Sequence, residues 1–180
     1  RLFDEILAWL EVNSHLLDTA RLRRILQRQD AETVRLIGAT LQYVSSRGDK
    51  RKWQNLVRFC EGTWKKQGDK DSADSLFKEK SGKSHPLILD NKIEPNFIVF
   101  GLNRPRIRVQ KSGKDAPVNA RANLRFLLRS LFSAGAKAET ILYLLTHEGG
   151  RPRDIAESVG LFWLSIQQAL LDLSRSGLVL

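Results

Sequence analysis

The chain has 180 residues, 42% hydrophobic and 28% charged, so it has enough apolar material for a core, and wholesale disorder is excluded. Thirty basic against 20 acidic side chains give a net charge of +10, which favours a polyanionic partner, either nucleic acid or an anionic membrane surface. The one cysteine excludes an internal disulfide and no apolar run has the length of a membrane span, so we expect a cytoplasmic protein. No predicted helix pairs a Lys/Arg-rich face with a strong apolar face, so we expect no membrane partner.

Residues 1–66 are predicted to form an N-terminal helical domain of four packed helices. Apolar residues recur there at intervals of three and four, as they do on the buried face of a helix. Asp30 precedes one of these patterns and has the chemistry of a helix N-cap.

The middle of the chain is predicted to separate two domains. Residues 67–85 are rich in Lys, Asp, Ser and Gly and nearly lack core residues, as a linker does. In residues 86–120, short apolar runs such as "NFIVFG" and the alternating "RIRVQ" favour a basic, extended segment or a small β-sheet. Its basic residues are either phosphate contacts or a solvated loop: Arg104, Arg106, Arg108, Lys111 and Lys114.

Residues 121–180 return to a helical pattern. A strongly apolar helix over 122–132 is our candidate dimer seam, and a second helix runs from about Ala136 to His147. Pro152 then suits the start of a third helix, and Gly160 permits a sharp turn. A fourth helix is predicted over 163–176, ended by Gly177 before a strand that starts at "LVL".

The spacing of the apolar residues and glycines in "RPRDIAESVGLFWLSIQQALLDLSRSGLVL" is similar to that of a known protein family. Ile155-Ala156 is followed by Gly160, then by Ile166 and Leu173 as the buried face of the next helix, then by Gly-Leu-Val. About residues 136–180 thereby resemble the winged helix-turn-helix domain of bacterial transcriptional regulators, whereas residues 1–120 resemble no family. The sequence stops at Leu180, where the wing should follow, so we expect a wing that is truncated or absent.

The resemblance implies readout of bases by the helix 163–176. In such domains the second helix enters the major groove, and its early outward residues reach base edges. The corresponding positions in this chain are Trp163, Leu164, Ser165, Gln167 and Gln168. The basic residues that flank this face, Arg151, Arg153 and Arg175, are expected to hold phosphates, which set affinity and register.

The start of this helix departs from the family pattern. The family has small or polar residues where this chain has Phe162, Trp163 and Leu164, and Leu171 is also apolar and outward-facing. Three interpretations remain open. These residues contact thymine methyls while the glutamines read bases, or they are buried against the N-terminal helices or a second subunit, or Phe162 and Leu164 complete the local core and leave only Trp163 exposed.

Catalytic signatures are missing from the sequence. It has no Walker-type glycine loop, no His-Glu-x-x-His and no Gly-x-Ser-x-Gly, and His15, His85 and His147 form no recognisable zinc set with Cys60. We therefore expect no enzyme, no cofactor and no metal.

The sequence thus predicts a mainly α protein, with an N-terminal helical domain, a short extended or small β segment, and a C-terminal winged helix-turn-helix. The predicted function is sequence-specific binding of double-stranded DNA as a transcriptional regulator with an unknown effector. A homodimer is expected, because one recognition helix reads too few bases. The alternative is a protein–protein interaction module with an apolar recognition helix.

Overall fold

The structure, a computed structural model, describes residues 2–67, 74–76, 93–107 and 113–179. Most of these residues are helical and very few are in strands, so the mainly α prediction is confirmed. They divide into two compact units. The first unit contains residues 1–11 and 26–113, and the second contains residues 12–25 and 114–180.

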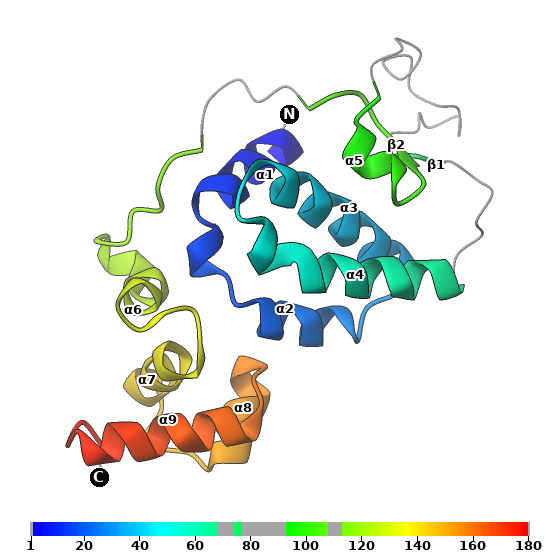
Figure 1. Ribbon diagram of the computed structural model, residues 1–180. Coiled ribbons are helices and arrows are strands. Elements are labelled where there is room, and N and C mark those ends of the chain that lie inside the picture. Colours follow the sequence, from blue (N-terminus) through cyan, green and yellow to red (C-terminus); the bar gives the residue numbers. More distant parts are fainter. Residues whose placement is uncertain (1, 68–73, 77–92, 108–112, 180) are drawn as a thin grey trace. The chain divides into compact units, whose positions relative to one another are not determined.

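Helices α3 (Ala31–Arg47) and α4 (Lys50–Gln67) form the centre of the first unit and run side by side (Figure 1). Asp30 caps α3 as predicted, since its carboxylate accepts a hydrogen bond from the N–H of Thr33 at 2.8 Å. Gly38 lets the two helices and a neighbouring ring pack closely, because a Cβ at this position would collide with Phe100 and Cys60. Helix α1 (Leu2–Val12) contributes Leu7 and Ala8 to the buried residues.

The segment after α4 contains a helix where the sequence predicted extended chain. "NFIVFG" falls in helix α5 (Pro95–Ile98) and the turn after it, with Pro95 at the helix start and Phe97 and Phe100 buried. The described strands are β1 (Asp74–Ser75) and β2 (Leu102–Asn103), which pair in parallel. The rest of the predicted linker 67–85, beyond Gln67 and residues 74–76, lies outside the described residues, as do residues 86–92 and 108–112.

Arg104 has a structural role that the sequence left open. Its side chain is only 4% exposed, and one of its guanidinium nitrogens lies 2.7 Å from the carboxylate of Asp4. The same guanidinium lies over the rings of Phe3 and Phe97. Arg104 therefore joins α1 to the α5 region and is not presented to a phosphate.

Four helices of the second unit follow one another as the sequence predicted: α6 (Leu124–Phe132), α7 (Ala136–Thr146), α8 (Pro152–Val159) and α9 (Trp163–Arg175) (Figure 1). A short 3-10 helix, η3 (Arg121–Asn123), precedes α6. The buried face predicted for α8 and α9 is confirmed, since Ile155, Ala156, Val159 and Ile166 form one apolar cluster with Leu161. Leu178 and Val179 are not in a strand, because the turn at Gly177 is not followed by pairing within the described residues.

An N-terminal segment belongs to this second unit, which differs from the predicted helical domain of residues 1–66. It consists of a 3-10 helix, η1 (Ser14–Leu16), and most of helix α2 (Thr19–Leu26). The buried side chain of Asn13 donates to the carbonyl of Lys114 at 2.9 Å and accepts from the N–H of Ala116 at 2.7 Å. Helical periodicity predicted that α2 has a buried face but not which helices it packs against.

Candidate nucleic-acid interface

The turn between α8 and α9 is built by one glycine and one buried leucine. Gly160 has φ +69°, the left-handed conformation that glycine adopts without strain. The N–H of Leu161 donates to the carbonyl of Ala156 at 3.0 Å, which closes the end of α8 in the manner of a Schellman motif. Leu161 is buried, so the turn is tied to the core and α9 starts in a defined place two residues later.

The outward face of α9 carries the polar residues that the sequence assigned to base readout. Ser165, Gln167 and Gln168 are all exposed, while Ile166, Ala169 and Leu173 of the same helix are buried. The alternation follows from the helical repeat, because residues three and four apart share a face. Leu164, also predicted to contact DNA, is 48% exposed on the same helix.

A chain of polar contacts crosses the middle of this face. The amide nitrogen of Gln168 donates to Asp172 at 2.9 Å, and Lys137 of α7 lies 2.8 Å from the other carboxylate oxygen. The hydrogen bond from Lys137, followed by that from Gln168, lowers the pKa of Asp172 below its ordinary value. Asp172 is therefore ionised at neutral pH, and Lys137 offsets its negative charge.

The apolar residues at the start of α9 are not part of the local core. Phe162 is 47% exposed, Trp163 36% and Leu164 48%, so the interpretation that Phe162 and Leu164 complete that core is wrong. The two aromatic rings lie next to each other, with centroids 6.3 Å apart. Contact with thymine methyls and burial against the N-terminal helices or a second subunit both remain predictions.

Arginines lie over both rings. The guanidinium of Arg153, from α8, is 5.5 Å from the ring centroid of Trp163. The guanidinium of Arg24, from α2, is 5.2 Å from the ring centroid of Phe162. Sequence reasoning had placed Arg153 at this surface but missed Arg24, because nothing local to a helix in residues 19–26 indicates that it packs beside residue 162.

The other two predicted phosphate contacts lie at separate places in the same unit. Arg151 is exposed at the N-cap position of α8, and Arg175 is exposed in the last turn of α9. The structure thus brings Arg153 to the start of α9 and leaves Arg175 at the opposite end of that helix.

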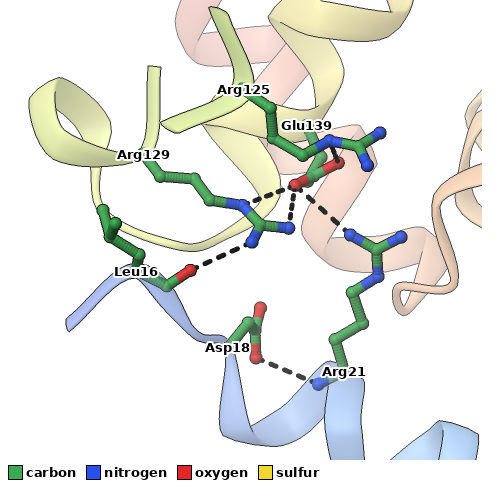
Figure 2. A network of polar contacts seen from close by, with 6 residues as sticks. All are labelled: Leu16, Asp18, Arg21, Arg125, Arg129 and Glu139. Atoms are coloured by element: carbon green, nitrogen blue, oxygen red, sulfur yellow. Dashed lines mark hydrogen bonds and ion pairs between the residues drawn. The ribbon is translucent and has the colours of Figure 1, made fainter. Parts of the chain in front are cut away.

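A buried carboxylate holds α2 against α6 and α7. Figure 2 shows Arg21, Arg125 and Arg129 pointing toward Glu139, whose side chain is 2% exposed. Arg129 donates through its Nε to Glu139 at 2.8 Å and through a terminal nitrogen to the carbonyl of Leu16 at 3.0 Å. Three guanidinium groups surround this carboxylate, and Arg125, at 3.5 Å, is the half-exposed one.

The part of the chain that the structure describes contains no group of three or more His, Cys, Asp or Glu residues able to hold a metal ion. Burial raises the pKa of the Cys60 thiol to about 11, which disfavours its thiolate form. Within the same residues, no helix is both long and apolar enough to cross a membrane. Comparisons of the chain with protein-family models, with curated proteins and with solved structures found no match.

Proposed function

We propose that the chain is a binding protein that recognises double-stranded DNA by placing α9 in the major groove. The arrangement of α8, the Gly160 turn and α9, with Ser165, Gln167 and Gln168 on the outward face, is the observation that carries this proposal. An α-helix fits the major groove, and a glutamine amide matches the paired donor and acceptor of adenine. The net charge of +10 supports attraction to phosphates.

In this proposal the protein is a cytoplasmic bacterial transcriptional regulator that binds as a homodimer. Two copies would read two half-sites and so double the number of bases recognised. Helix α6 offers an apolar surface for pairing, because Leu131 is 66% exposed and Phe132 40%. A wing and an effector are not needed for the proposed contact between α9 and the groove.

A specific observation favours a second candidate function, a protein–protein interaction module. Four large apolar side chains on or next to α9 are exposed in a surface that would otherwise be expected to be polar: Phe162, Trp163, Leu164 and Leu171. Contiguous exposed apolar side chains are typical of surfaces that bind another protein.

Titration with duplex DNA at two salt concentrations tests the proposal. The protein should bind a labelled duplex at low salt, and its affinity should fall steeply as salt rises, because bound phosphates release counterions. Absence of binding at low salt would reject DNA binding and leave the interaction module as the better candidate.

A further inference from the structure

Two arginines and two aromatic rings form a continuous row at the start of α9. Arg24 lies over Phe162, the ring of Phe162 lies beside that of Trp163, and Arg153 lies over Trp163. We call these four residues the arginine–aromatic row. Its members come from α2, the turn before α9, α9 itself and α8, so it exists only in the folded unit.

Contacts of Asp18 and Arg21 hold helix α2 where the side chain of Arg24 reaches the ring of Phe162. The carboxylate of Asp18 accepts hydrogen bonds from the N–H groups of Ala20 and Arg21 and so caps the helix. Arg21 pairs with the buried Glu139 at 3.3 Å (Figure 2). Its side chain also runs past the turn, since a Cβ on Gly160 would lie 3.7 Å from its Nε. Arg24, three residues later, shares that face of α2.

The two arginines of the row differ from those around Glu139, because only the latter pair with a carboxylate. Arg21, Arg125 and Arg129 all pair with Glu139. Within the described residues, no carboxylate forms an ion pair with Arg24 or Arg153, and each guanidinium lies over an aromatic ring.

A ring beneath a guanidinium restrains its plane without occupying its hydrogen-bond donors. The cation–π attraction uses none of the five N–H groups of the guanidinium, so these groups remain able to donate to the oxygens of a phosphate. Such restraint reduces the side-chain entropy lost when an anion binds. The row therefore has the chemistry of two oriented phosphate-binding arginines.

We propose that Arg24 and Arg153 bind backbone phosphates beside the groove that α9 enters, and that Phe162 and Trp163 are platforms that orient them. This inference rests on the proposed function and assigns to α2, in the N-terminal part of the chain, a part of the DNA-binding surface. It gives the aromatic residues at the start of α9 a role that does not require them to read bases.

Arginine substitutions in the full chain test the phosphate contacts. The probe is a fluorescein-labelled duplex of random sequence, with affinity followed by anisotropy from about 50 to 200 mM salt. Arg24→Gln and Arg153→Gln should each reduce the slope of log affinity against log salt by about one, and weaken binding about fivefold near 0.1 M salt. Arg24→Lys keeps the charge and should keep most of the slope.

Arg58→Gln is the matched control, because Arg58 is an exposed arginine on a helix of the other unit. It should leave the slope unchanged. A slope that falls equally in this variant would mean that bulk charge alone matters, which would overturn the assignment of Arg24. An unchanged slope in Arg24→Gln would overturn it as well.

Ring substitutions test the platform role. Phe162→Leu removes the ring but keeps an apolar side chain, so it should weaken binding to the random duplex. Combined with Arg24→Gln it should add little further loss, because both changes remove one interaction. Additive losses would contradict the platform role. Thermal unfolding of each variant checks that the second unit stays folded.

These measurements distinguish failure of this inference from failure of the proposed function. If the unsubstituted protein fails to bind duplex DNA at low salt, the proposed function itself is rejected and this inference falls with it. If that protein binds with a steep salt dependence but the Arg24 and Phe162 variants bind as it does, DNA binding by α9 stands and only the arginine–aromatic row is rejected.

Discussion

The amide of Gln168 has a partner inside the protein that a base would have to replace. Its nitrogen donates to Asp172 one helical turn away, at 2.9 Å. Both residues lie at the solvent-facing side of α9, so water can take over the contact and the exchange costs little. In the proposed complex, adenine would take the place of Asp172 as the partner of the Gln168 amide.

We predict that Gln168→Ala weakens binding to a selected recognition site by about 1–3 kcal/mol and changes binding to random duplex very little. The loss is specific because a bidentate contact with one base is removed while the phosphate contacts remain. Competition binding with the two duplexes measures it. Gln54→Ala, at an exposed glutamine on α4, is the control and should affect neither. Equal losses on both duplexes would remove Gln168 from the readout role.

The start of α3 depends on one exposed carboxylate. Asp30 accepts hydrogen bonds from the N–H and the hydroxyl of Thr33, both at 2.8 Å. The backbone hydrogen bond from Thr33, followed by that from its side chain, lowers the pKa of Asp30 below the ordinary value of 3.8. A lowered folded-state pKa means that the cap stabilises the protein above that value and loses this effect as pH falls below it.

We therefore predict that Asp30→Ala lowers the melting temperature at pH 7, and that the difference from the unsubstituted protein narrows as the pH falls from about 5 to below 3.8. Circular dichroism melts across this range measure it. Asp49→Ala is the comparison variant on α4. Asp49 caps the first turn of that helix, because its carboxylate accepts a hydrogen bond from the N–H of Lys52 at 3.1 Å. A difference in melting temperature that does not change with pH would show that the ionised carboxylate is not what stabilises α3.

Helix α6 is buried at Leu128 and Arg129 and exposed at its C-terminal end. Leu128 is 7% exposed, but Leu131 is 66% and Phe132 40% exposed. The sequence could not distinguish these positions, because all three residues are large and apolar and lie on one side of the helix. Exposed apolar side chains on adjacent positions agree with the proposal that α6 is a dimer seam.

We predict that Leu131→Asp shifts the protein from dimer to monomer and leaves its fold intact, because a charge is introduced at an exposed position in the proposed seam. Sedimentation velocity measures the oligomeric state, and a melting curve checks the fold. Ser130→Asp, one position earlier on the exposed surface of the same helix, tests whether any new charge on α6 has this effect. A Leu131→Asp protein with the sedimentation behaviour of the unsubstituted chain would reject α6 as the seam.

At the scale of the whole molecule, the second unit is assembled from two distant parts of the chain. Residues 12–25 and 114–180 are joined by the Asn13 side chain and by the arginines around Glu139. Arg129 connects the carboxylate to the carbonyl of Leu16, which lies 113 positions earlier in the sequence. The proposed DNA-binding unit therefore includes its N-terminal segment.

We predict that Glu139→Ala destabilises the second unit by about 3 kcal/mol, because the buried guanidinium of Arg129 would lose its compensating charge. Chemical denaturation measures the free energy of unfolding. Glu157→Ala, at an exposed position on α8, is the matched control and should change it very little. Similar stabilities for the two variants would show that the Glu139 cluster does not hold the unit together.

The sequence by itself determined the local structure of the C-terminal part. The spacing of apolar residues predicted α6 to α9, Pro152 and Gly160 predicted where a helix starts and where a turn falls, and the exposure of Ser165, Gln167 and Gln168 followed from the helical repeat. These features depend on residues within one or two turns of each other, which is why periodicity and capping chemistry suffice to predict them.

Only the tertiary structure decided which distant residues meet. It placed α2 with the C-terminal helices, buried Arg104 against Asp4, and set Arg24 over Phe162, 138 positions later in the chain. An amphipathic pattern specifies that a helix has a face to bury but carries no information about its partner, since many apolar surfaces satisfy the same hydrophobic requirement. The charges that line the proposed DNA-binding surface are therefore set by packing between remote segments.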